Sequence, residues 1–267
     1  TLRTGVEKSR NLMTVRIAQN IGIKKIAKFA KELNIYENPE ELLSLSLGSS
    51  ETSLLKLTNA YCSFVNGGKL IIPKFIDRIQ DSEGNTIFNS ENRECQGCNQ
   101  ISYLSENIPK IKNNFKQVFS KETAYQMTSI LEGTVKRGTA KKLKDLNLDL
   151  GGKTGTTNKN TDTWFVGFSS NYVIGVYVGY DVPSSLGKYE TGSRTAMPIF
   201  KTFVKNAIKK DNARPFKIPK GIKMLVVNSK TGERASYSDE SIIIEAFKEK
   251  NLINNKIQYG NIDYISK

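Results

Sequence analysis

Histidine is absent from this chain of 267 residues. Its absence excludes Ser-His-Asp and Cys-His nucleophilic mechanisms and every metal site built on imidazole. Covalent catalysis by such a chain needs another base, and lysine is the obvious candidate. We expect neither a metal ion nor a cofactor.

Cysteine is scarce, with three residues. Cys62 lies in the apolar run AYCSFV and is predicted to be a core residue. Cys95 and Cys98 form CQGC in a polar stretch, with no second pair and no histidine to complete a zinc site. We interpret the pair as a small disulfide of an oxidising compartment, with two free thiols as the alternative.

Long apolar runs are also lacking. The longest, YVIGVYVGY at residues 172–180, has the length of a strand and is too short to cross a membrane. No signal peptide opens the chain, which begins abruptly inside an ordered pattern. We expect it to be the C-terminal piece of a longer protein.

The formal net charge is +14. Such a charge suits an anionic partner, which can be nucleic acid, a membrane face or an acidic polymer. The lysines are spread along the chain rather than gathered in one stripe, so a bias of composition is the preferred explanation. Arginine is scarce and is not interleaved with aromatic residues, so we predict no nucleic-acid partner.

Apolar spacing predicts helices, the first of them capped by Ser9, at residues 9–21, 23–33, 53–66, 120–137 and 195–209. A period-two pattern over 69–88 predicts a small hairpin, and a polar irregular loop follows as far as residue 114. Strands are predicted as an antiparallel meander at 150–157, 163–169 and 171–181, with a further short strand at 224–227. This order predicts an α+β fold with an antiparallel sheet flanked by helices.

The stretch LGGKTGTTNKNTDTWFVGF at residues 150–168 carries the main chemical signal. On a strand, Thr154 and Thr156 point to the same face, so both hydroxyls can reach one carboxylate. Lys153 projects from the other face and adds positive potential, and Gly155 lets a substrate backbone approach closely. The N–H of Thr156 is placed to donate to an oxyanion. These features predict a carboxylate site in an acyl-transfer enzyme that uses no histidine.

Several similar triplets occur elsewhere. A second Lys-Thr-Gly, in VVNSKTGERAS, begins at Lys230 and is predicted to be an ordinary turn. Ser9-Arg10-Asn11 is the candidate Ser-x-Asn element, although alone it also suits a helix cap. Ser-x-x-Lys occurs at Ser53 and at Ser185, which are predicted to be a helix start and a loop.

Five stretches occur in a telling order: RTGVEKSRNLMTVRIAQNIGI, LGSSETSLLKLTNAYCSFVNGG, VKRGTAKK, GGKTGTTNKNTDTWFVGFSSNYVIGVYVGYD and TGSRTAMPIFKTF. Together they resemble the transpeptidase domain of bifunctional class A penicillin-binding proteins of the 1A type, over nearly the whole chain. The resemblance implies a penicillin-binding-protein/serine β-lactamase-like fold. It also implies a transpeptidase domain at residues 1–215, incomplete at its N-terminus, and a C-terminal extension at 216–267.

The resemblance also implies roles for the site residues. Ser9 would relay a proton, and Asn11 would hold the substrate amide and the catalytic lysine of the family. Lys153, Thr154 and Thr156 would hold the terminal carboxylate of a D-Ala-D-Ala stem peptide or of a β-lactam. The implied parent cross-links peptidoglycan in the cell wall at the periplasmic face of the bacterial inner membrane.

This sequence departs from the family pattern in one respect. The family's nucleophile lies in a Ser-x-x-Lys motif several dozen residues before Ser-x-Asn, and this chain starts eight residues before Ser9. We expect the nucleophile, its lysine, the glycosyltransferase domain and the N-terminal membrane anchor to lie outside this sequence. The alternatives are a D,D-carboxypeptidase or β-lactamase relative, and a non-catalytic fragment that binds peptidoglycan or a protein partner.

Overall fold

The computed structural model describes residues 1–90, 93, 95–98, 108–112, 115–208, 214–254, 258–259 and 262–263. The α-helices in this part of the chain are α1 (Leu2–Glu7), α2 (Asn11–Ile21), α3 (Ile23–Glu32), α4 (Leu54–Val65), α5 (Lys121–Lys136), α6 (Ala196–Ala207) and α7 (Glu249–Asn254). Short 3-10 helices are η1 (Leu43–Leu47), η2 (Lys141–Leu146) and η3 (Asn158–Asn160). Among these described segments, no helix has the length and apolar character needed to span a bilayer.

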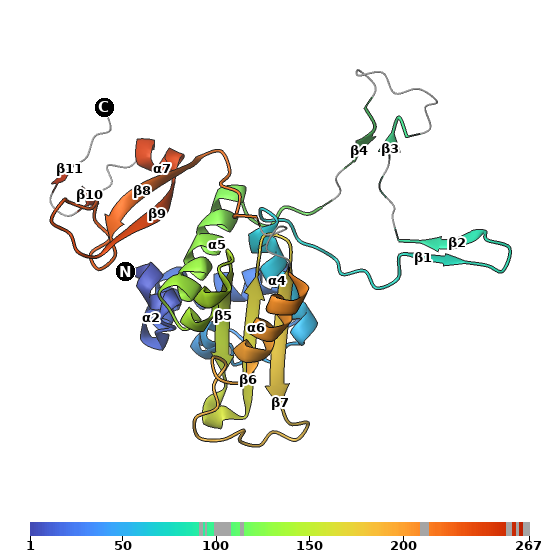
Figure 1. Cartoon of the computed structure of the whole chain (residues 1–267), viewed down its shortest axis with the longest axis horizontal. Helices are drawn as coiled ribbons and strands as arrows, with labels where there is room; N and C mark the ends of the chain where they lie inside the picture. The colour runs from blue at the N-terminus through green and yellow to red at the C-terminus, as the bar shows by residue number, and fades with distance from the viewer. Residues whose placement is uncertain are drawn as a thin grey trace.

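The strands form antiparallel sheets. Those of the body and the protruding arm are β1 (Arg78–Gln80), β2 (Thr86–Asn89), β3 (Cys95–Gln96), β4 (Lys110–Ile111), β5 (Gly151–Thr156), β6 (Asp162–Phe168) and β7 (Val173–Gly179). The C-terminal strands are β8 (Ile222–Asn228), β9 (Ile242–Lys248), β10 (Gln258–Tyr259) and β11 (Ile262–Asp263). The central sheet has the order β5-β6-β7, which leaves β5 at one edge (Figure 1).

Helices cover both faces of the central sheet. Side chains alternate along a strand, so Phe165 on β6 faces α6, where its ring meets Phe200 edge-on with the centroids 4.9 Å apart. Gly175 on β7 belongs to the opposite face and lies against α4, where a Cβ would come 2.0 Å from the hydroxyl of Thr58. The predicted antiparallel meander, the helix packed on it and the α+β class are therefore confirmed.

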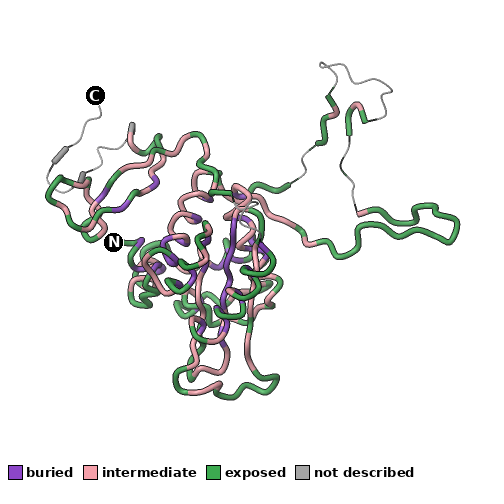
Figure 2. Tube along the Cα trace, in the orientation of Figure 1, coloured by how far each residue is buried: buried purple, intermediate pink, exposed green. Residues whose placement is uncertain are grey.

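Burial is concentrated between the sheet and its helices (Figure 2). One cluster of buried apolar side chains joins α5, η2, β5, β6 and α6, and it comprises Val135, Ala140, Leu143, Leu150, Phe165, Ala196, Met197, Phe200, Val204 and Ile208. This cluster holds β5 in a fixed position against α5. The geometry of the candidate site depends on that position.

Side-chain caps begin two helices where the sequence predicts. Ser53 accepts a hydrogen bond from the N–H of Lys56 at 3.2 Å, and Ser120 accepts one from the N–H of Thr123 at 3.3 Å. The prediction for Ser9 is wrong, because α2 begins at Asn11 and no side chain caps it. The chain must reverse direction between α1 and α2, and Ser9 occupies that reversal with a left-handed φ of 52°.

Residues 70–119 include an arm that extends away from the body (Figures 1 and 2). The predicted hairpin is present as β1 and β2, and Asp81 holds its turn by accepting from the N–H groups of Glu83 and Asn85 at 2.9 and 2.8 Å. Cys95 and Cys98 form a disulfide, as preferred from the sequence. Much of the predicted polar loop lies outside the described residues.

Two further sequence predictions need correction. Cys62 is half-buried rather than part of the core, because its side chain lies on a flank of α4. The short strand predicted at 224–227 is the middle of β8, which pairs with β9 over seven residue pairs. The strand β9 has no counterpart among the elements predicted from the sequence. The boundary of the extension at residue 216 stays a prediction.

Thr163 provides a test of the packing on β6. Its side chain is fully buried, and no hydrogen-bond partner for its hydroxyl exists in the described part of the chain. Burying an unpaired hydroxyl costs about 1–3 kcal/mol, so Thr163→Val should raise the free energy of unfolding by about 1 kcal/mol in urea titrations. As a control, Thr134→Val should lower it by about 1–2 kcal/mol, because the Thr134 hydroxyl lies 2.7 Å from the carbonyl of Gly152. Loss of stability in Thr163→Val would contradict this account.

Candidate active site

Lys153 is the centre of the candidate site. It extends from β5 towards the turn between α1 and α2, and its Nζ donates to the hydroxyl of Ser9 at 2.6 Å and to the carbonyl of Thr154 at 3.0 Å. Burial lowers the pKa of Lys153 from its ordinary value to about 8. Ser9 and Lys153, which are 144 positions apart in the sequence, are thus hydrogen-bonded in the structure. The pKa of the lysine amine lies close enough to neutral pH for it to gain or lose a proton there.

Ser9 is held in a tight reversal of the backbone. Its N–H donates to the carbonyl of Val6 at 3.1 Å, and the next N–H, that of Arg10, donates to Gly5 at 2.8 Å. A left-handed φ is uncommon for a residue other than glycine and costs on the order of 1 kcal/mol or more. The surrounding contacts must therefore impose it.

A partly buried ionic cluster lies next to this reversal, at the end of α1. It comprises Arg3 and Glu7 of α1, Arg137 at the end of α5, and Glu245 of β9. Arg3 and Glu7 are only 5% and 4% exposed. Arg3 pairs with Glu245 and Glu7, and Arg137 donates to Glu7 at 2.6 and 3.1 Å. The pKa of Arg3 is raised by these partners although desolvation, the largest influence, opposes the charge. This cluster fixes the end of α1, two residues before Ser9.

The segment after α5 connects this cluster to β5. The N–H of Thr139 donates to the carbonyl of Glu7 at 3.2 Å, and the hydroxyls of Thr139 and Thr154 lie 3.2 Å apart. Gly138 permits this approach, because a Cβ there would lie 2.2 Å from the carbonyl oxygen of Glu7. The segment at Gly138 and Thr139 therefore contacts both the end of α1, next to Ser9, and the strand that carries Lys153.

The free edge of β5 presents backbone groups beside these side chains. The N–H of Thr157 donates to the carbonyl of Asp162 on β6. Hydrogen-bonding direction alternates along an antiparallel strand, so the N–H of Thr156 points away from β6, to the open edge. The hydroxyl of Thr156 accepts from the N–H of Gly192 at 3.0 Å, which leaves its own proton able to donate. This edge offers an N–H group and hydroxyls together.

The remaining predicted residues occupy different positions. Asn11 is the exposed first residue of α2, and within the described chain its side chain makes no hydrogen bond. Gly155 lies between the two threonines, and a Cβ there would be 3.1 Å from the Cβ of Trp164. Trp164 is half-buried, with its ring edge-on to Tyr177 at 4.8 Å and its Nε1 donating to Asp162 at 3.0 Å.

The similar triplets lie elsewhere. Lys230 and Thr231 form the turn between β8 and β9, where both N–H groups donate to Asn228 Oδ1 at 2.9 and 3.3 Å. The sequence prediction of an ordinary turn is therefore confirmed. Ser53 caps α4, and Ser185 lies in the loop after β7, where its hydroxyl accepts from the N–H of Gly187 at 3.2 Å.

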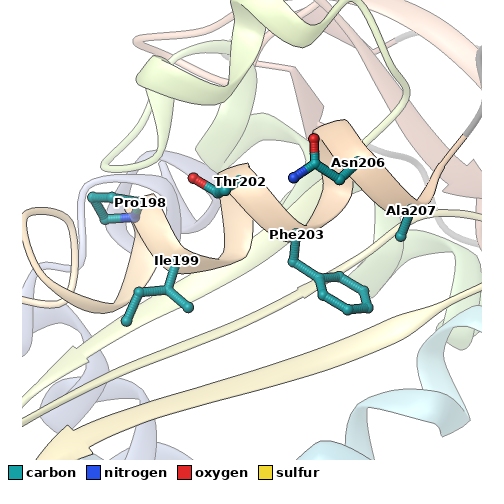
Figure 3. Close-up of a pocket in the computed structure, with 6 residues that line it drawn as sticks. All are labelled: Pro198, Ile199, Thr202, Phe203, Asn206 and Ala207. Carbon is teal, nitrogen blue, oxygen red and sulfur yellow. The ribbon is translucent and has the colours of Figure 1, made fainter.

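A surface hollow of about 680 Å³ lies on the outer side of α6 (Figure 3). It is lined by Pro198, Ile199, Thr202, Phe203, Asn206 and Ala207. None of these six side chains can act as an acid, a base or an activated nucleophile at neutral pH. The chemistry of the molecule therefore points to the Lys153 region rather than to this hollow.

Two residues of the site, Thr139 and Gly192, were not predicted from the sequence as site residues. Thr139 belongs to VKRGTAKK, and Gly192 belongs to TGSRTAMPIFKTF. No sequence motif marks either residue as part of the site, because each contacts a residue that is distant in sequence. Their contacts with Thr154 and Thr156 span 15 and 36 positions.

A lysine bonded to a serine, beside a strand edge that carries two threonines, fits the class of serine acyltransferases that work without histidine. Comparison with known proteins agrees. The family model described as "Penicillin binding protein transpeptidase domain" matches residues 1–205. The chain belongs to this family of penicillin-binding transpeptidases.

The similar proteins include penicillin-binding protein 1A of Rickettsia conorii, which is 45% identical over 254 residues, covering 94% of this chain and 32% of the relative. The crystal structure of penicillin-binding protein 1A from Haemophilus influenzae superposes with a TM-score of 0.77 at 30% identity, covering 92% of this chain and 39% of that one. Penicillin-binding protein A of Mycobacterium tuberculosis, solved as an imipenem acyl-enzyme complex, has a TM-score of 0.56 at 15% identity, over 77% and 47% of the two chains. At that identity the likeness shows the fold alone. The chain spans about a third of the length of its 1A relatives.

The bond between Ser9 and Lys153 can be tested by titration. In a lysine-labelled sample followed by NMR, Lys153 should titrate near pH 8. Ser9→Ala should lower this pKa further, because the hydroxyl oxygen that accepts from the ammonium is lost. Ser46→Ala, which removes a hydroxyl bonded to the carbonyl of Leu43, should leave it unchanged. A wild-type midpoint near the ordinary lysine value of about 10.4 would contradict the burial of the amine.

Proposed function

We propose that this chain supplies the carboxylate-binding and proton-relay half of a peptidoglycan D,D-transpeptidase site. The observation that carries the proposal is the contact between Lys153 Nζ and Ser9 Oγ, next to the open edge of β5. Lys248 also donates to a hydroxyl, that of Thr123 at 2.6 Å, but it lies on β9 and not beside the two threonines of β5.

The substrate lies along β5 in this proposal. Thr154 and Thr156 donate from their hydroxyls to the terminal carboxylate of a D-Ala-D-Ala stem peptide or to that of a β-lactam, and the positive potential of Lys153 favours the same anion. The N–H of Thr156 donates to the carbonyl oxygen on which negative charge develops, an interaction of about 3 kcal/mol in related oxyanion sites. Gly155 leaves room for the peptide backbone.

The proton relay uses the pair formed by Ser9 and Lys153. An amine with a pKa of about 8 exchanges its proton easily at neutral pH, so the pair can pass a proton towards a leaving amine. Asn11, exposed at the start of α2, holds the substrate amide and the catalytic lysine of the family. The left-handed turn at Ser9 aims the hydroxyl at Lys153 rather than at the helix.

The nucleophile comes from a Ser-x-x-Lys segment of the longer protein. Its Oγ attacks the penultimate D-Ala carbonyl and forms an ester, and the terminal D-Ala leaves as a protonated amine. The amine of a neighbouring stem peptide then attacks the ester and releases the serine, which forms the cross-link. The parent protein works at the periplasmic face of the bacterial inner membrane, anchored by an N-terminal helix. The Cys95–Cys98 disulfide is consistent with that oxidising compartment.

Ligand binding tests the carboxylate site directly. In NMR titrations, diacetyl-L-Lys-D-Ala-D-Ala should bind the chain, and the same peptide with a C-terminal amide should bind at least about tenfold more weakly, because one charge-assisted hydrogen bond contributes about 1.5–3 kcal/mol. The double substitution Thr154→Val and Thr156→Val should abolish this difference.

The second Lys-Thr-Gly offers a matched control for that experiment. Thr231→Val lies in the turn between β8 and β9 and should leave the affinity for both peptides unchanged. Equal binding of the acid and the amide by the wild-type chain would refute the carboxylate site.

Covalent labelling tests where the nucleophile lies. The 267-residue chain should form no adduct with a fluorescent penicillin on denaturing gels, because the Ser53 hydroxyl accepts a helix N–H and its neighbour Lys56 pairs with Glu37 at 2.7 Å. A penicillin-binding protein that contains Ser-x-x-Lys serves as the positive control. A labelled band that disappears in Ser53→Ala or Ser185→Ala would show that one of these serines is activated.

A further inference from the structure

Two cations surround one exposed aromatic ring in the loop between β7 and α6. The Nζ of Lys188 lies 5.6 Å and the guanidinium carbon of Arg194 lies 5.8 Å from the centroid of the Tyr189 ring, and this tyrosine is 64% exposed. Cation–π contacts of this kind orient the cationic groups without neutralising them. The loop thus presents an ordered pair of positive charges at the surface.

This basic loop is attached to the carboxylate site. The N–H of Gly192, two residues before Arg194, donates to the hydroxyl of Thr156 at 3.0 Å. The backbone there is so close to β5 that a Cβ on Gly192 would lie 2.5 Å from the carbonyl oxygen of Gly155. On the other side, Asn160 donates to the carbonyls of Gly187 and Lys188 at 2.9 and 3.0 Å. Movement of the loop is therefore coupled to the end of β5.

The two cations have no acidic partner in the part of the chain that the structure describes. Glu190, the acidic residue between them in sequence, accepts a hydrogen bond from the hydroxyl of Thr195 at 2.5 Å. Each of these exposed cations can therefore pair with an anion from outside the loop. The loop therefore fits a negatively charged group close to the one that Thr156 would bind.

We propose that Arg194, with Lys188 and Tyr189, forms a subsite for a second carboxylate on the peptide whose terminal carboxylate binds at Thr154 and Thr156. This proposal rests on the proposed function, since it assumes that a peptide lies along β5. Arg194 supplies a planar fork that matches a carboxylate in two parallel hydrogen bonds, and Tyr189 holds that fork in position. The subsite selects stem peptides that carry an extra acidic group.

Binding of two peptides distinguishes this subsite from the site for the terminal carboxylate. The first is diacetyl-L-Lys-D-Ala-D-Ala, with one carboxylate, and the second carries a succinyl group on the lysine Nε, which adds a second. In NMR titrations at about 0.15 M salt, where screening beyond about 8 Å suppresses general attraction to a basic chain, we expect the succinyl peptide to bind five- to tenfold more tightly. Arg194→Gln should reduce this ratio to about one while the affinity for the first peptide stays unchanged.

Two further variants control for charge and geometry. Lys205→Gln removes a positive charge near the other end of α6 and should keep the wild-type ratio. Arg194→Lys keeps the charge without the planar fork and should give an intermediate ratio. If the wild-type chain binds both peptides equally, or if Lys205→Gln lowers the ratio as much as Arg194→Gln, the subsite is wrong although the carboxylate site stands. If neither peptide binds, the proposed function fails and the subsite fails with it.

Discussion

The partly buried ionic cluster of Arg3, Glu7, Arg137 and Glu245 is the constraint on which the candidate site depends. A buried ion pair adds little net stability, because desolvation offsets the attraction, but removal of one partner leaves an uncompensated charge that costs about 3–5 kcal/mol. The cluster matters here because it fixes the positions of the elements that carry the site. The cluster joins α1, α5 and β9, and it holds the end of α1 where Ser9 can reach Lys153.

The same constraint explains the local strain in the site. With Glu7 fixed and α2 beginning four residues later, the chain has only a short reversal in which to change direction. Ser9 adopts a left-handed conformation there, and the hydroxyl that would otherwise cap a helix is turned towards an amine. Lys153 in turn loses solvent, which lowers its pKa. The ionic cluster thus sets the position of the pair, and burial sets the acidity of its amine.

The sequence predicts most of the helices and strands but few of the contacts between them. Alternation and glycine content identify the three strands of the central sheet, and apolar spacing identifies α4 and α5, which Ser53 and Ser120 cap in the structure. The cap assigned to Ser9 is wrong because a tertiary contact outweighs the local preference. The parts of Thr139 and Gly192 have no sequence signal of their own, since each is defined by a partner on another element. Propensity rules describe one element at a time, whereas this site lies at the junction of several.

The position of β5 at the margin of its sheet has a consequence for the behaviour of the protein in concentrated solution. A strand that leaves one side unpaired for a guest peptide offers the same row of donors and acceptors to any extended chain, including that of a neighbouring molecule. The short length of β5, six residues, limits such pairing. The edge that would receive a peptide is therefore also a surface at which two molecules of the protein can associate.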